Sequence, residues 1–358
     1  MRLFVAAIVA AFALPAAAQS VIPENDIISG AIEGYIRPAF HQFAEETGSL
    51  QLNVSNLCAT PSADALTTAQ NQFRSAVIAF SRIEFVRMGP LGKFDRLERL
   101  LFWPDRKGIA LRQVQTALAD KDPTVATPET LQGKSVAMQG FAALEFLLFG
   151  TGSIDLTSAA GEYRCAYAES SATLIDGLAQ TIDTEWQDTS PEGATAHMLS
   201  PQPTFDDYRT TTEVLEKLAA TLVHGTETMR DQRLTPVLGA SGDKPKPRSA
   251  LFWRSNMTVP ALAANFEGLH DFFLAARYPE AIGKTNDWVA NGAIFEFENA
   301  ARAAALVVDP MEKAVTDPEQ VQALKYMVVI TGSLDHLLGE NLAAALGLSF
   351  GFSALDGD

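Results

Sequence analysis

Apolar residues recur at helical spacing along most of this chain. From Asp26 to Thr47 they fall mostly three or four positions apart, and only Pro38 interrupts the pattern. No segment alternates apolar and polar residues with the period of two that a half-buried strand shows, so the sequence predicts an all-α fold. We predict helices at about 26–47, 61–86, 109–119, 128–149, 161–186, 205–230, 259–276, 281–308 and 318–346.

One polar segment divides this helical pattern into two parts. Residues 189–203 are rich in Pro, Ser, Thr and Gly and carry few apolar residues, which is typical of a linker. The length of 358 residues also suits two domains better than one. We therefore expect a signal peptide at 1–18, an N-terminal helical bundle at 19–190, a linker at 191–203 and a C-terminal helical bundle at 204–358.

The two predicted bundles carry matching segments in the same order, which favours an internal duplication. Both contain a glutamate and an arginine three residues apart, then a Leu-Phe-Trp run, then a glycine followed by Leu and an acidic residue. The matching positions are Glu84 and Arg87 with Glu227 and Arg230, residues 101–103 with 251–253, and Gly140 and Glu145 with Gly332 and Asp335. The fold we predict is therefore two helical-bundle units related by duplication.

The segment 135–154 is the most apolar of the predicted helical segments. Apolar residues occupy every face of it, which indicates a buried helix, and Glu145 is the one ionisable residue between Lys134 and Asp155. A buried carboxylate loses its hydration, so it must hold a proton, pair with a cation or bind a metal. The sequence leaves these three alternatives open, and a purely structural carboxylate is as compatible with it as a functional one.

The residues Gly140 to Glu145 resemble the Gly-x-His-x-x-Glu signature of the imelysin-like family, but Ala142 stands where the family has histidine. Residues 88–90, 102–105, 248–249 and 252–255 also resemble that family. The resemblance implies an ancient duplication, a role in the acquisition of iron or another metal at the bacterial envelope, and a classification as metallopeptidase. The cofactor it suggests is iron or zinc, and the partner is a metal ion or an envelope iron-uptake protein.

The replacement of histidine by Ala142 changes the chemistry that this segment offers. A histidine and a glutamate at i and i+3 project from one helix face and can supply two metal ligands, whereas this helix supplies only Glu145. The change favours a binding protein over an enzyme. Two alternatives remain, a metallopeptidase whose metal lies elsewhere and an interaction scaffold without metal.

Other candidate residues lie in the duplicated element. His224 precedes Glu227 by three positions, which makes His224 a second candidate metal ligand beside Glu145. Arg87 and Arg230 each follow a glutamate by three positions, so they either pair with buried carboxylates of other helices or form exposed intrahelical pairs.

The N-terminus and the overall charge indicate an exported protein. Arg2 is the only charge in residues 1–18, an apolar run follows it, and Ala16-Ala17-Ala18 matches a signal-peptidase site. We expect a periplasmic protein with no transmembrane segment in the mature chain. A net charge of −16 argues against nucleic acid as a partner. In an oxidising compartment Cys58 and Cys165 are expected to pair, with two separate buried thiols as the alternative.

Overall fold

The computed structural model describes residues 20–105, 107–239 and 244–349, and helices form the whole of its regular secondary structure within those ranges. The all-α prediction is confirmed. The α-helices are α1 (Glu24–Ala31), α2 (Arg37–Ala59), α3 (Ala63–Ser81), α4 (Arg96–Leu100), α5 (Ile109–Asp120), α6 (Pro128–Leu131), α7 (Gly140–Phe149), α8 (Glu162–Gln187), α9 (Ala194–Leu199), α10 (Thr211–Thr228), α11 (Thr235–Leu238), α12 (Thr258–Ala275), α13 (Tyr278–Ala281), α14 (Asp287–Ala305), α15 (Met311–Ala314), α16 (Pro318–Asp335) and α17 (Leu342–Leu346).

Short π-helical and 3₁₀-helical turns connect several of these helices. The π-helical turns are Ile32–Ile36, Met229–Leu234 and His336–Asn341. The 3₁₀ turns are Gly89–Gly92, Pro123–Val125, Val136–Met138, Ser153–Thr157, Ala159–Gly161, Pro247–Ser249 and Lys284–Asn286.

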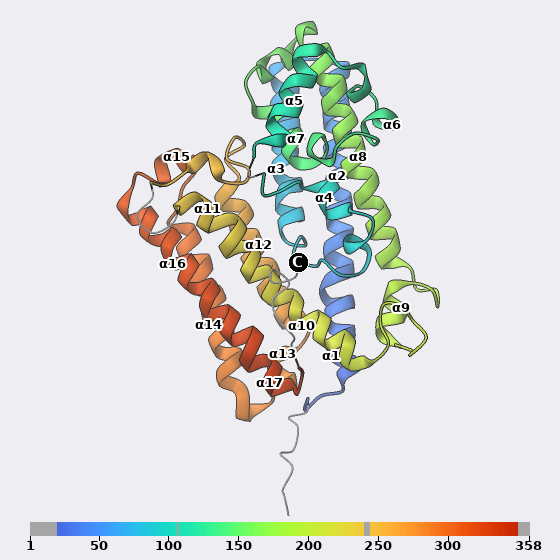
Figure 1. Cartoon of the computed structure of the whole chain (residues 1–358), viewed down its shortest axis with the longest axis vertical. Coiled ribbons are helices and arrows are strands. Elements are labelled where there is room, and N and C mark those ends of the chain that lie inside the picture. The colour runs from blue at the N-terminus through green and yellow to red at the C-terminus, as the bar shows by residue number, and fades with distance from the viewer. Residues whose placement is uncertain (1–19, 106, 240–243, 350–358) are drawn as a thin grey trace, which may run out of the picture.

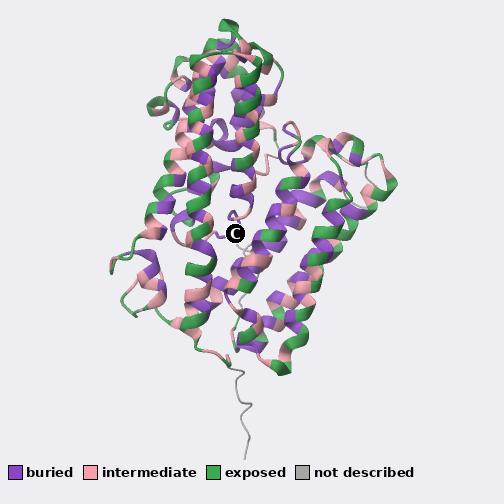
Figure 2. Ribbon diagram, turned by 180° about the vertical axis from the view of Figure 1, so that it is seen from behind, coloured by how far each residue is buried: buried purple, intermediate pink, exposed green. Residues whose placement is uncertain are grey.

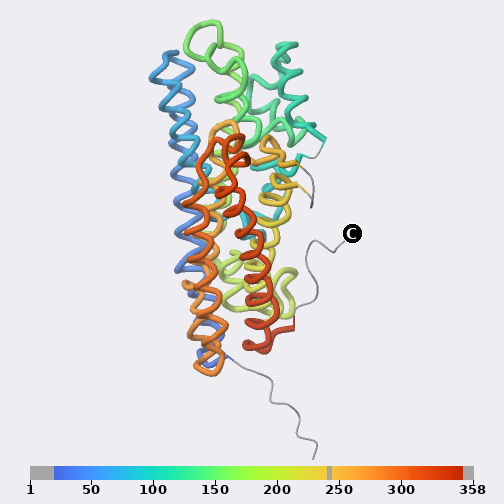
Figure 3. Tube along the Cα trace, turned by 90° about the vertical axis from the view of Figure 1, so that its left-hand side faces the viewer, coloured from blue at the N-terminus to red at the C-terminus, as the bar shows by residue number. Residues whose placement is uncertain are grey.

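The helices form two groups that lie side by side (Figure 1). In the first group α2 packs along α3 and α8, and α7 packs on α8 with α5 beside it. In the second group α14 packs on α12 and α16, and α10 packs on α16. The short α1 precedes the first group in the chain but packs against α10 and α12 of the second. Seen from the side, the long helices of both groups follow the long axis of the molecule (Figure 3).

The two groups meet along α3 and α12. Gly268 allows this close approach, since a Cβ atom there would lie 2.5 Å from the carbonyl oxygen of Arg82. Buried residues concentrate on the inner faces of the helices (Figure 2), and the buried apolar side chains of both groups form one continuous cluster. The expected boundaries at 190 and 204, and the duplication itself, stay predictions.

The first predicted helix is longer than the sequence pattern indicated. Its helical path runs from Glu24 to Ala59, and Pro38 does not break it. Pro38 follows the π-helical turn Ile32–Ile36 and occupies the second position of α2, where its missing N–H interrupts the helix least.

The predicted helix at 128–149 is wrong as one continuous element, because it divides into α6, a 3₁₀ turn and α7. Gly140 begins α7 with φ +70°, a left-handed conformation that favours glycine. A Cβ atom at this position would lie 2.4 Å from the carbonyl oxygens of both Arg99 and Leu100. The close approach of the main chain at Arg99 and Leu100 therefore requires glycine at this position, where α7 begins.

Three further expectations concern the segments outside the long helices. The segment expected to be a linker contains α9, whose Met198 is fully buried. Thr195 of α9 also donates a hydrogen bond of 3.0 Å to the carbonyl oxygen of Trp186. The expected signal peptide at 1–18 lies outside the described residues. None of the helices in the described ranges is both long and apolar enough to cross a bilayer.

Candidate functional site

The candidate site is a cleft of about 620 Å³ between the two helix groups. One wall comes from residues 102–105 and 108–114 and from α7, and the other comes from residues 231–236 and 246–254. The motif residues Ala142 and Glu145 both line it. A cavity of this size, with apolar walls and a few polar groups, suits a small molecule.

Glu145 is buried on the cleft wall, with 4% of the residue exposed, and the second helix group supplies its partners. Its Oε1 atom accepts hydrogen bonds from the main-chain N–H of Ser255 at 3.0 Å and from the Ser255 hydroxyl at 2.8 Å. The guanidinium of Arg254 lies 4.0 Å from Oε2, which is ion-pair distance but too long for a hydrogen bond. The arginine near Glu145 is therefore Arg254 and not Arg87, the partner that the duplicated element suggested.

The charge of Glu145 is set by opposing effects. Burial raises the pKa of the carboxyl group, while the two hydrogen bonds from Ser255 and the positive charge of Arg254 lower it by smaller amounts. Burial likewise lowers the pKa of Arg254, opposed by Glu145. A carboxyl whose pKa is raised near a cleft is a feature of functional sites, although structural ion pairs share it.

A tight turn at 251–257 carries Ser255 and Arg254 to this position. Phe252 and Asn256 adopt positive φ, and the Phe252 ring packs on Phe73 and Phe141, with centroids 6.1 and 6.4 Å apart. The carbonyl oxygen of Ser255 accepts a hydrogen bond of 3.2 Å from Nε of Arg74. The turn therefore inserts from the second helix group into the core of the first, which orients Ser255 toward α7.

The cleft does not offer the ligands that a directly bound metal ion needs. Ala142 has no donor atom, and Glu145 Oε1 is engaged by Ser255. The Asp105 carboxylate accepts hydrogen bonds from the N–H groups of Ile109 and Ala110 at the start of α5. Within the described ranges, no group of three or more His, Cys, Asp or Glu side chains could hold a metal. The residues of the cleft thus do not fit a metal centre of their own.

The predicted site residue Glu84 lies at a different contact between the helix groups. It is buried, and its carboxylate accepts hydrogen bonds from Arg233 at 2.7 Å and from Asn265 at 2.8 Å. Both partners come from the second group, while Glu84 follows α3 of the first. Glu84 therefore joins the two groups electrostatically, through residues that the sequence pattern did not single out.

Arg87 lies close enough to His224 for its positive charge to lower the pKa of that histidine. Burial lowers the pKa of Arg87, and the nearby Glu84 partly offsets this shift. Burial and the charge of Arg87 both lower the pKa of His224, which favours its neutral form. Glu227 is buried in α10, in the same helix as His224. These residues do not line the cleft that contains Glu145.

Arg230 forms a third, separate ionic contact. Its guanidinium is paired with Asp335 of α16 and with Asp231, and Thr226 also donates a hydrogen bond to Asp335. Gly140 allows the left-handed backbone conformation at the start of α7. The predicted site residues are therefore distributed over several places: Gly140 and Glu145 share α7, His224 and Glu227 share α10, and Glu84 and Arg230 lie at separate ionic contacts.

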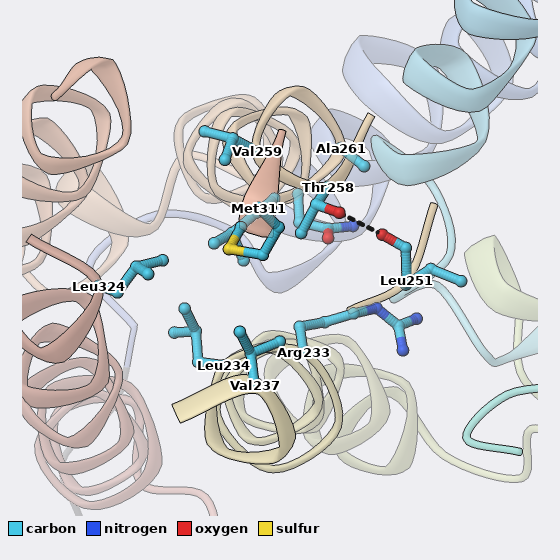
Figure 4. A pocket seen from close by; sticks show the side chains of 11 residues that line it. Arg233, Leu234, Val237, Leu251, Thr258, Val259, Ala261, Met311 and Leu324 are labelled. Atoms are coloured by element: carbon cyan, nitrogen blue, oxygen red, sulfur yellow. Dashed lines mark hydrogen bonds between the residues drawn. The ribbon is translucent and has the colours of Figure 1, made fainter. Parts of the chain in front are cut away.

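A smaller cavity of about 20 Å³ lies within the second helix group (Figure 4). Its lining is mostly apolar, with Leu234, Val237 and Met311 among the side chains, while Thr258 donates a hydrogen bond to the carbonyl oxygen of Leu251. This volume holds about one water molecule. The cavity is therefore too small for an organic ligand, and the cleft is the better candidate.

The sequence matches the imelysin family, also designated peptidase M75, over residues 36–335. The chain belongs to the imelysin family. No match to this imelysin-family chain was found among curated proteins.

Two solved structures share the fold of this imelysin-family chain. One is an imelysin-like protein from Psychrobacter arcticum 273-4, with 19% sequence identity and a TM-score of 0.78, covering 93% of this chain and 99% of the other. The second is described as a "putative iron-regulated protein A precursor" from Parabacteroides distasonis ATCC 8503, with 14% identity and a TM-score of 0.73, covering 91% and 96%. At these identities the two structures establish the fold alone.

Proposed function

We propose that this imelysin-family protein is an exported, non-catalytic binding protein linked to the acquisition of iron or another metal at the bacterial envelope. The observation that carries the proposal is the position of Ala142 on the wall of the cleft, beside Glu145. A cleft of about 620 Å³ is present there without the ligands of a metallohydrolase. This chain would thus keep a binding cleft at the place where Ala142 replaces the signature histidine of the family.

The chemistry of the cleft supports binding rather than hydrolysis. A metallopeptidase must activate water with a metal or a general base and must polarise the scissile carbonyl. Glu145 accepts two hydrogen bonds from Ser255, and Ala142 contributes neither a ligand nor a base. A metallopeptidase remains the second candidate, because the family carries a peptidase designation.

The link to metals rests on relatives. One similar structure is described as an iron-regulated protein A precursor, qualified as "putative". A periplasmic location, after removal of residues 1–18, would place the cleft where imported metals pass. The metal would then be cargo that the protein receives or presents, rather than a resident cofactor.

We also propose that the two helix groups are duplicated units. Each Leu-Phe-Trp turn makes a contact across the boundary between the groups. Trp103 donates a hydrogen bond of 3.1 Å to the carbonyl oxygen of Gln232, and Phe252 packs on Phe73 and Phe141. Reciprocal contacts of this kind are what duplication of one ancestral unit would produce.

A growth experiment tests the function. The gene is deleted in its own bacterium, and the strain is complemented with the wild type or with Ala142→Phe, which would partly fill the cleft. We expect the deletion to impair growth only when iron or zinc is scarce, and Ala142→Phe to rescue poorly at wild-type protein levels. Normal growth of the deletion strain under both shortages would overturn the metal link.

Two measurements on the purified protein separate the alternatives. Metal-dependent cleavage of casein that is lost in a folded Glu145→Ala variant would establish the peptidase. Elemental analysis of Ala142→His, which restores the family's His and Glu spacing, should find more bound zinc or iron than in wild type, since two ligands then share one helix face. Equal metal content in the two proteins would contradict the role assigned to Ala142.

A further inference from the structure

We propose that the cleft binds a small aromatic carboxylate, with the anionic group on Arg254 and the ring against the aromatic walls. This inference deepens the proposed function and rests on it, because it names the chemical class of the ligand that the same cleft receives. It follows from the cations, the engaged carboxylates and the flat apolar surfaces that line the cleft.

Arg254 is the central cation of the cleft. Its guanidinium lies 4.4 Å from the ring centroid of Trp253 and 5.4 Å from that of Phe146, so two aromatic side chains hold it in place. The structure gives this guanidinium no hydrogen bond to another described residue, and Glu145 at 4.0 Å is its acidic neighbour. A planar fork of N–H donors therefore remains available, and it matches the geometry of a carboxylate.

Two further cations stand at the same cleft. The guanidinium of Arg248 also lies over the Trp253 ring, 5.3 Å from its centroid. It forms an ion pair with Glu312 at 3.6 Å. Lys246 is exposed and also lines the cleft. Three cationic side chains therefore stand at one place on a chain of net charge −16, where each can donate to an anionic group.

The acidic residues of the cleft offer few free acceptors to a ligand, because each is engaged within the protein. Asp105 accepts from the first N–H groups of α5, and Asp231 pairs with Arg230. Glu145 accepts both hydrogen bonds of Ser255. The groups that remain available to a ligand are therefore mainly the N–H donors of Lys246, Arg248 and Arg254.

The apolar part of the lining indicates the shape of the ligand. Phe102, Trp103, Phe146 and Trp253 present aromatic rings, and Leu111 and Val114 add aliphatic contacts. Flat rings bind flat apolar groups by stacking or edge contacts. A small ring that carries a carboxylate satisfies both the cations and the walls, whereas an isolated metal ion finds too few ligands.

Titration calorimetry with three aromatic carboxylates, namely salicylate, 2,3-dihydroxybenzoate and phthalate, tests the proposal. We expect saturable binding of at least one of them, and at least about tenfold weaker binding of a neutral amide of the same acid, since a hydrogen-bonded charge pair is lost. The ferric complex of the same acid is titrated separately. Tighter binding of the complex than of the free acid would mean that the cleft prefers the metal-loaded form. No saturable binding of any of the three up to about 10 mM, weaker than most specific binding, would overturn the proposal.

Variants locate the site. Arg254→Leu should weaken binding at least about tenfold, and Arg254→Lys should weaken it less, because the charge remains but the fork is lost. The matched control is Arg302→Leu, which removes an exposed arginine of α14 that does not line the cleft and should leave the affinity unchanged. Circular dichroism and melting temperature establish that each variant is folded. Equal affinity of folded Arg254→Leu and wild type would contradict the assignment.

Glu145→Gln separates this proposal from direct metal binding. Glutamine keeps a carbonyl oxygen for the donors of Ser255 and removes the negative charge beside Arg254, so the affinity for the acid should rise, whereas a site that used Glu145 as a metal ligand would lose its ligand. Loss of carboxylate binding in folded Glu145→Gln would overturn the proposal. Binding of the acid together with normal growth of the deletion strain would uphold this site and reject only its link to metal acquisition.

Discussion

Ser255 brings two donors to one oxygen of Glu145, its main-chain N–H at 3.0 Å and its hydroxyl at 2.8 Å. The two residues are 110 positions apart and belong to different helix groups. The contact therefore stabilises the buried carboxylate and also fixes the turn 251–257 against α7. Since Arg254 precedes Ser255, the same contact sets the position of the central cation of the cleft.

The first prediction concerns this contact. Ser255→Ala removes the hydroxyl and leaves the main-chain donor, so the free energy of unfolding should fall by about 1.5 to 3 kcal/mol, the range for hydrogen bonds to charged groups. Urea unfolding of both proteins measures the difference. In a Glu145→Gln background the same substitution should cost less, and strictly additive effects of the two changes would show that the residues are not coupled.

The second prediction concerns the pH dependence of stability. Burial raises the pKa of Glu145, and the charged and polar groups that face it are Arg254 and Ser255. Above the ordinary glutamate pKa and below the raised one, the folded state holds a proton that the unfolded state has lost. Stability contributed by the protonated carboxyl is therefore present at low pH and lost as pH rises through the folded-state pKa.

Glu145→Gln isolates this effect, because glutamine is close in shape to the protonated acid and does not titrate. The free energy of unfolding of the variant minus that of wild type should increase as pH rises from about 4.5, by at most about 1.4 kcal/mol per pH unit. Urea unfolding at a series of pH values measures it. A difference that decreases with pH would mean that Arg254 and Ser255 outweigh burial.

The sequence could predict the helices and the burial of Glu145, but not the residues that contact it. A helix with apolar residues on every face must be buried, so a carboxylate within it must be buried too. Helical periodicity does not say where a turn more than a hundred residues away will lie. Ser255 and Arg254 were visible only as part of a family-like segment, with no signal that they meet Glu145.

The ionic contact at Glu84 shows a second limit. The duplicated pattern singled out Arg230, which pairs with Asp335 of α16, and it passed over Arg233, which bonds to Glu84. Both arginines lie in the π-helical turn Met229–Leu234, whose i→i+5 hydrogen bonding departs from the α-helical register. An analysis based on a period of 3.6 residues cannot anticipate which way their side chains point.

The third prediction tests this contact. Arg233→Met should lower the free energy of unfolding by about 3 to 5 kcal/mol, because it leaves Glu84 buried without its cationic partner. The double variant Arg233→Met with Glu84→Gln should recover part of the loss. Arg302→Met is the control, since its pair with Glu298 is exposed and should contribute at most about 1 kcal/mol. Similar losses of stability in Arg233→Met and Arg302→Met would contradict a buried pair between Arg233 and Glu84.

The fourth prediction concerns the cysteines. In the structure a disulfide joins Cys58 of α2 to Cys165 of α8, with Cα atoms 5.5 Å apart and 107 positions between them in the sequence. A loop of this length corresponds to a stabilisation of up to about 4 to 5 kcal/mol in the chain-entropy model. Thiol titration of the unfolded, unreduced protein should find no reactive thiol, and reduction should lower the melting temperature. Two reactive thiols would refute the bond.

The last prediction compares two glycines that the duplicated pattern places at matching positions, Gly140 and Gly332. Gly140 has φ +70°, and a Cβ atom there would lie 2.4 Å from two carbonyl oxygens of the main chain. Backbone atoms cannot move aside cheaply, and the left-handed conformation alone costs an alanine about 1 to 2 kcal/mol. Gly140→Ala should therefore destabilise the protein by at least about 2 kcal/mol and disturb α7, which carries Glu145.

Gly332 provides the matched control within the same chain. It lies inside α16, and a Cβ atom there would meet no other atom within 4 Å. Gly332→Ala should therefore raise the free energy of unfolding by up to about 1 kcal/mol, since alanine is the better helix former. Urea unfolding measures both variants. Opposite signs would mean that the two motif glycines serve different purposes, and equal destabilisation would instead indicate a shared structural requirement at both positions.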